Sequence, residues 1–273
     1  MTSDLEYTIL TFVLWGLLPF LLMGSLAGLL SGLLGIGGGL ILVPMLTLAG
    51  IGLHQAVGMS LLYILITGFS GALTHFRQGH LKLDLAFFLA LGGCIFSYLG
   101  TRFSHLLPEA WLSWLFTALV AVIMGLFWKR MRHQESGERK PFRLASGRVI
   151  AVLIGSLAGL LSGIFGVGGG FVMTPLLNIL LPLSVEESIG TSLAAIVMIS
   201  AAGAASHFFV GDLFSVLQAQ PLAMLFLGGA GALSAPWGAR LTRVFSPRQL
   251  QAGLFILMGL VAVYMLLFGF HSH

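Results

Sequence analysis

Between Glu6 and Arg77 the sequence contains no charged residue, and none follows Arg248. Both stretches are long enough to cross a bilayer, because a membrane-spanning helix needs about 20 apolar residues. With 58% hydrophobic and 8% charged residues, a chain of 273 residues carries more apolar surface than a soluble core can hide. The sequence therefore predicts an all-α integral membrane protein whose apolar faces are covered by lipid.

Apolar segments fill most of the chain and differ in length. The segments at 40–49 and 171–181 are too short to cross a bilayer at about 1.5 Å per residue, and they are interpreted as half-helices. The longer segments, which include 110–128, 213–238 and 250–270, predict about eight transmembrane helices.

The sequence contains two copies of one pattern. GSLAGLLSGLLGIGGGLILVPML, which begins at Gly24, matches GSLAGLLSGIFGVGGGFVMTPLL, which begins at Gly155, at about two thirds of its positions. The match continues at a constant offset as far as His75 and His207. We therefore divide the chain into a first transmembrane repeat at 1–128, a basic loop at 129–148 and a second transmembrane repeat at 149–273.

Basic residues concentrate in the loop between the repeats. Seven of the thirteen Lys and Arg lie within 129–148, and loops with such a bias stay on the cytoplasmic side of a membrane. No basic stretch is interleaved with aromatic residues, so nucleic acid is not a predicted partner. The pattern places this loop in the cytoplasm.

The shorter loops of the two repeats carry opposite charge patterns. The turn after the third segment has Arg77 and Lys82 in the first repeat, but only Asp212 in the second. The next turn has Arg102 in the first repeat and three arginines in the second (Arg240, Arg243 and Arg248). This reversal predicts inverted repeats with both termini outside. If the short segments at 40–49 and 171–181 enter the membrane in a different way, both termini lie inside instead.

Each repeat contains a glycine block, at 35–39 and at 166–170, which is followed by Pro44 or Pro175. Consecutive glycines, each costing a helix about 1 kcal/mol, favour broken or re-entrant helices at these blocks. Unwound N–H groups from both blocks suit an anion bound near the midplane, although close helix packing is an alternative role for these glycines. The glycines at four-residue spacing before the blocks are expected to form packing stripes (Gly24, Gly28 and Gly32; Gly155, Gly159 and Gly163). The predicted binding residues are the two prolines and six glycines (Gly37, Gly38, Gly39, Gly168, Gly169 and Gly170).

Each block has the form G-I/V-G-G-G-x(4)-P, and a G-x-S motif and then a histidine follow it. Two such copies over nearly the whole chain resemble the TauE/SafE sulfite exporter family. The resemblance implies a permease of the bacterial inner membrane. Members of that family are linked to sulfite, sulfoacetate and other small sulfur-containing or organic anions, so the resemblance implies transport and leaves the solute open.

Polar residues at matching places of the two repeats complete the predicted site. The hydroxyls of Ser60, Thr191 and Ser192 are expected either to donate to a bound oxyanion or to cap their helices. His75 and His207 are expected either to carry a coupling proton or to bond the backbone at the membrane interface. Neither histidine belongs to a metal-ligand motif, so no metal site is predicted.

The predicted function is secondary transport of a small anion, such as sulfite or a sulfonate, by a protein that is not an enzyme and uses no cofactor. A passive anion channel or a structural membrane subunit is the alternative. A more remote one is an intramembrane hydrolase that uses Ser31 or Ser162 as nucleophile. The sequence contains no ATP-binding motif, and it leaves open whether the chain forms a homo-oligomer.

Overall fold

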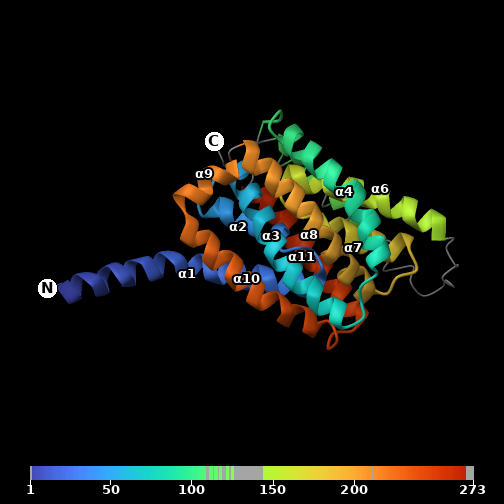
Figure 1. Ribbon diagram of the computed structural model, residues 1–273, viewed down its shortest axis with the longest axis horizontal. Helices are drawn as coiled ribbons and strands as arrows, with labels where there is room; N and C mark the ends of the chain where they lie inside the picture. The colour runs from blue at the N-terminus through green and yellow to red at the C-terminus, as the bar shows by residue number, and fades with distance from the viewer. Residues whose placement is uncertain are drawn as a thin grey trace.

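The computed structural model describes residues 2–108, 144–210 and 212–268, together with 111–112, 114–115, 117–118, 121–122 and 124–125. Within these ranges the regular secondary structure is helical throughout and no strand occurs, which confirms the all-α prediction (Figure 1). The labelled helices are α1 (Thr2–Leu34), α2 (Gly39–Leu48), α3 (Leu53–Arg77), α4 (Leu83–Ser104), α6 (Leu144–Phe165), α7 (Gly170–Leu180), α8 (Val185–Val210), α9 (Asp212–Ala219), α10 (Pro221–Leu241) and α11 (Pro247–Phe268).

Six of these helices are long and apolar enough to cross a membrane, namely α1, α3, α4, α6, α8 and α10. The predicted span at 110–128 lies partly outside the described residues. Helix α11 has 22 residues and is apolar as far as Val263, the last of its residues whose side chain is described. The count of about eight transmembrane helices therefore stays a prediction, as does the loop at 129–148, most of which is also not described.

The predicted continuous segment at 213–238 is wrong. It is divided into α9 and α10, and Pro221 is the first residue of the second helix. Proline has no N–H to donate to the preceding turn, and its ring disfavours helical geometry at the residue before it. Gln220 accordingly has φ −138° and ψ 56°, and the chain changes direction there.

Two pairs of helices from different halves of the sequence pack in close contact: α1 with α10, and α4 with α6 (Figure 1). Glycines at four-residue spacing make these contacts. A methyl group added at Gly24, Gly28 or Gly32 would overlap backbone atoms of Leu227, Gly231 or Ala235, respectively. Methyl groups at Gly155, Gly159 and Gly163 would overlap backbone atoms of Leu89, Gly93 and Ser97. The packing role predicted for these glycines is confirmed, and both helix pairs run parallel.

Helices α3 and α8 cross at the centre of the bundle in opposite directions. Gly58 of α3 lies against His207 of α8, whereas Gly190 of α8 lies against His75 of α3.

Helix α4 runs parallel to α8, since Gly93 meets Ile199 and Gly203 meets Ser97. Helix α3 runs parallel to α1, because the Tyr63 hydroxyl bonds the Gly24 carbonyl and the His75 ring bonds the Gly32 carbonyl. Thus α1, α3 and α10 point one way, and α4, α6 and α8 point the other.

These directions give the bundle two chemically different ends. At one end α3 and α10 finish and α4, α6, α8 and α11 begin. We call it the basic end, because it gathers six basic residues (Arg77, Lys82, Arg148, Arg240, Arg243 and Arg248). Ion pairs join Lys82 to Glu187 at 2.8 Å and Arg148 to Asp84 at 3.3 Å there. At the other end α3 begins and α4 and α8 finish. We call it the histidine end, after His54, His105 and His207.

Candidate functional site

The helices break at both glycine blocks. Helix α1 ends at Leu34 and α2 begins at Gly39, while α6 ends at Phe165 and α7 begins at Gly170. In each break three glycines have φ between 68° and 80° (Gly35, Gly37, Gly38, Gly166, Gly168 and Gly169). Other residues occupy this left-handed region at a cost of about 1–2 kcal/mol each, which explains why glycine stands at all six positions.

The two breaks meet in the middle of the bundle. A methyl group at Gly39 would overlap the carbonyl of Gly166, and one at Gly170 would overlap the carbonyl of Gly35. Methyl groups at Gly37 and Gly168 would both meet the side chains of Ile64 and Ile196, which belong to α3 and α8. We call this arrangement of 35–39, 166–170, Ile64 and Ile196 the glycine crossing. It brings together the six glycines that the sequence selected, one set from each half of the chain.

Hydroxyl groups from α3, α7 and α8 tie the two breaks together. The Ser60 hydroxyl donates to the Gly166 carbonyl at 2.6 Å, and the Ser192 hydroxyl donates to the Gly35 carbonyl at 3.1 Å. Thr174 also donates to the Gly35 carbonyl at 3.1 Å. The alternative of helix capping is wrong for these serines, because α3 begins at Leu53 and α8 at Val185, well before them.

Three other predicted site residues lie away from the crossing. Thr191 accepts the backbone N–H of Lys82 at the basic end. The buried ring of His75 bonds the Gly32 carbonyl at 3.0 Å, and the buried ring of His207 lies 3.5 Å from the Gly163 carbonyl. Both histidines thus contact the last turns of α1 and α6, but they lie at opposite ends of the bundle and do not share one site.

A carboxylate approaches the second of these histidines. Nδ1 of His207 lies 3.2 Å from Oδ2 of Asp212, the first residue of α9. The hydrogen bond with His207 holds the pKa of Asp212 below its usual range, although burial opposes this shift. Asp212 is therefore ionised at neutral pH.

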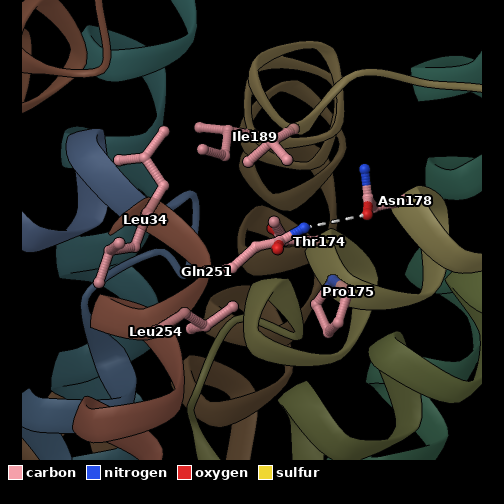
Figure 2. Close-up of a pocket in the computed structure, with 9 residues that line it drawn as sticks. Leu34, Thr174, Pro175, Asn178, Ile189, Gln251 and Leu254 are labelled. Atoms are coloured by element: carbon pink, nitrogen blue, oxygen red, sulfur yellow. Dashed lines mark hydrogen bonds between the residues drawn. The ribbon is translucent and has the colours of Figure 1, made fainter. Parts of the chain in front are cut away.

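A small pocket, with room for about one water molecule, lies beside α7 (Figure 2). Pro175 lines it, and the side chain of Gln251 in α11 points toward Asn178 in α7, with 3.5 Å between its Nε2 atom and Oδ1 of Asn178. Pro44, the matching proline, is buried inside α2. Sequence reasoning missed the two amides, because single polar residues in apolar helices give no signal of which cavity they line.

Ser31 and Ser162 form a second pair that the predicted site did not include. Each lies four residues before the first glycine of its block and is fully buried, and its hydroxyl has no hydrogen-bond partner among the described residues. An unpaired buried hydroxyl costs about 1–3 kcal/mol, so its presence at matching places in both halves calls for a ligand or water as partner. The sequence placed both serines on the packing stripes, where their lack of partners could not be seen.

Comparison with known proteins identifies the family. The family model described as Sulfite exporter TauE/SafE matches residues 20–265. The chain is 30% identical over 255 residues to the "Probable membrane transporter protein YjnA" of Bacillus subtilis, which covers 89% of this chain and 96% of the relative. It is 26% identical to the "Probable membrane transporter protein MJ0441" of Methanocaldococcus jannaschii, over 92% of this chain and 96% of that one. No solved structure matches significantly.

The family model covers most of the chain, including both glycine blocks. The names of the relatives and the six apolar helices agree on a protein that crosses the membrane several times. The chain therefore belongs to the TauE/SafE family of membrane transporters.

Proposed function

We propose that this protein is a secondary transporter for a small anion, such as sulfite, a sulfonate or a small carboxylate, which binds at the glycine crossing. The observation that carries the proposal is that two helix N-termini meet there, because α2 begins at Gly39 and α7 at Gly170. The first N–H groups of a helix lack acceptors within that helix and carry partial positive charge. Two such ends in one buried place favour an anion.

The contacts of the two halves support inverted repeats. The serine contacts at the crossing match between the halves, since Ser60 bonds Gly166 as Ser192 bonds Gly35. Helices α1 and α6, which carry the matching sequences, point in opposite directions. A two-fold axis in the membrane plane, passing between Ile64 and Ile196, would relate the halves in this way.

The distribution of charge supports an orientation in the membrane. The basic end holds six Lys and Arg (Arg77, Lys82, Arg148, Arg240, Arg243 and Arg248), whereas Arg102 is near the histidine end. Because basic residues are retained on the cytoplasmic side, the basic end faces the cytoplasm of a bacterial inner membrane. Helix α1 begins at the opposite end, so the N-terminus is outside.

Transport then follows from a rearrangement at the crossing. In this structure Ile64 and Ile196 fill the space between Gly37 and Gly168, so an anion needs these side chains and the two breaks to separate. Rocking one repeat against the other would open the crossing to each side in turn. His75, which bonds the helix leading into the first break, is the group that we expect to couple this movement to a proton.

The alternatives fit less well. A hydrolase needs a nucleophile hydrogen-bonded to a base, but the hydroxyls of Ser31 and Ser162 have no such partner among the described residues. A passive channel needs a continuous path, which the isoleucines at the crossing block in this conformation. A carrier is therefore the proposal that the geometry supports best.

Flux measurements on the purified protein in proteoliposomes test this proposal. We expect saturable, self-exchanging uptake of one labelled anion among sulfite, sulfate, thiosulfate and small carboxylates, and a dependence on an imposed pH gradient if protons are coupled. Flux that does not saturate and shows no countertransport would favour a channel. No flux of any of these anions above empty vesicles would remove the small-anion proposal.

The unpaired serines give a prediction about substrate affinity. Replacing Ser31 and Ser162 by alanine is expected to leave thermal stability unchanged or slightly higher, because it removes two buried hydroxyls that have no partner in the part of the chain that the structure describes. The KM for the transported anion should rise by about tenfold if both hydroxyls donate to it.

Ser60→Ala provides the matched comparison. It leaves the Gly166 carbonyl without its hydroxyl partner, so it should destabilise the protein by about 1–2 kcal/mol, measured as a lower melting temperature in detergent. An unchanged KM in the Ser31→Ala/Ser162→Ala variant would show that these hydroxyls do not contact the anion.

A further inference from the structure

Four polar side chains from four helices gather at the histidine end. They are His54 in α3, His105 at the end of α4, His207 in α8 and Asp212 in α9. The His105 Nε2 atom lies 3.0 Å from Oδ2 of Asp212, and His207 Nδ1 lies 3.2 Å from the same oxygen. The ring of His54 stacks on that of His105 with 4.5 Å between their centroids.

We propose that His105, His207 and Asp212 form a binding site for Zn²⁺ or a similar transition-metal ion. One ligand atom from each residue lies within 4.8 Å of the others. A tetrahedral zinc ion with bonds of about 2.0–2.2 Å holds its ligand atoms about 3.4 Å apart. Both histidine nitrogens already lie near this distance from Oδ2 of Asp212, and the two nitrogens are at most 4.8 Å apart, so a small adjustment of the side chains is sufficient. Two imidazoles and one carboxylate are also a ligand set that zinc uses in proteins.

The surroundings of His207 support a metal ligand. Its Nδ1 faces the Asp212 carboxylate and its Nε2 faces the Gly163 carbonyl, so both ring nitrogens face acceptors. A neutral imidazole has one N–H and can satisfy only one of them. With a metal ion between Nδ1 and Asp212, the single N–H is left for the carbonyl, which is the usual way in which a ligating histidine is oriented.

The other two ligands leave the site accessible from water. The side chains of His105 and Asp212 are 27% and 21% exposed, whereas His207 is fully buried. An ion can therefore enter from the histidine end, and water can supply a fourth ligand. The stacked ring of His54 restricts the orientation of His105.

The matching positions at the basic end lack this ligand set. By the offsets of the duplication, His207 corresponds to His75, but Asp212 corresponds to His80 and His105 to Arg243. The metal site is thus not a by-product of the duplication. It also ties the two halves together, because His105 comes from the first half and His207 and Asp212 come from the second.

Isothermal titration of the purified full chain with Zn²⁺ tests the proposal, with Mg²⁺ as the comparison ion. We expect the wild type to bind one Zn²⁺ at this site and not to bind Mg²⁺ there, since magnesium prefers oxygen ligands. His105→Ala and Asp212→Asn should each weaken zinc binding by at least about tenfold. His80→Ala, at the corresponding place in the other half, should bind zinc as the wild type does.

Two further measurements make the outcome decisive. Melting temperatures without metal establish that each variant is folded, and zinc should raise this temperature in the wild type and in His80→Ala but not in the ligand variants. Because His133, His271 and His273 lie elsewhere in the sequence, the same titration is run with all three replaced by alanine. Zinc binding that is absent from the wild type, or that is equal in wild type, His105→Ala and Asp212→Asn, would overturn the proposal. These readouts do not depend on transport.

Discussion

Gly168→Ala is expected to abolish transport while leaving a folded protein in the membrane. At this position φ is 75°, and the new methyl group would meet the side chains of Ile64 and Ile196. The left-handed backbone costs alanine about 1–2 kcal/mol, which a folded bundle can tolerate. The methyl group itself, however, occupies the place where two helix N-termini meet and where, in the proposed mechanism, the anion approaches the backbone. Flux in proteoliposomes at matched protein amounts is the measurement.

Gly50→Ala is the control for this experiment. Gly50 also has a positive φ, of 85°, but a methyl group added there meets nothing within 4 Å. It therefore carries the same backbone cost without filling the crossing, and it should transport the anion at close to the wild-type rate. If Gly168→Ala transported equally well, the anion would not pass through the glycine crossing. If Gly168→Ala alone failed to fold, the block would serve packing instead.

Much of this site could be predicted from local sequence. The breaks follow from consecutive glycines in an apolar chain, because no favourable helix passes through three residues that cost it so much. The short length of α2 and α7 and the packing of the four-spaced glycines could be read in the same way. These features depend on helix propensity and on the spacing of residues along one helix, and both are determined by residues that are close together in the sequence.

Other features depend on contacts that no local pattern encodes. Ser60 was open to interpretation as a cap, because the sequence does not show that α3 begins at Leu53 or that a carbonyl of the other half lies within reach. The cluster at the histidine end was missed for the same reason. In the sequence, the central loop and helices α6 and α7 lie between His105 and His207, so their spacing resembles no metal-ligand motif.

The second large effect is expected from the glycine stripe between α4 and α6. A methyl group in Gly159→Ala would overlap the backbone of Gly93. Backbone atoms cannot avoid this overlap by a change of rotamer, as a side chain can. Overpacking of this kind typically costs about 1–3 kcal/mol, more than the roughly 1 kcal/mol that alanine gains in helix propensity. Lipid gives apolar helices no hydrophobic reason to associate, so the close backbone contact is what holds the pair together.

We therefore expect Gly159→Ala to lower the melting temperature in detergent, and Gly155→Ala/Gly159→Ala to leave little folded protein in the membrane. The control is Gly229→Ala in α10, where a methyl group meets nothing within 4 Å and the helix gains propensity. That variant should melt at or above the wild-type temperature. A Gly159→Ala protein as stable as Gly229→Ala would mean that α4 and α6 can separate without loss, and the parallel helix pairs would not be the framework that holds the glycine crossing.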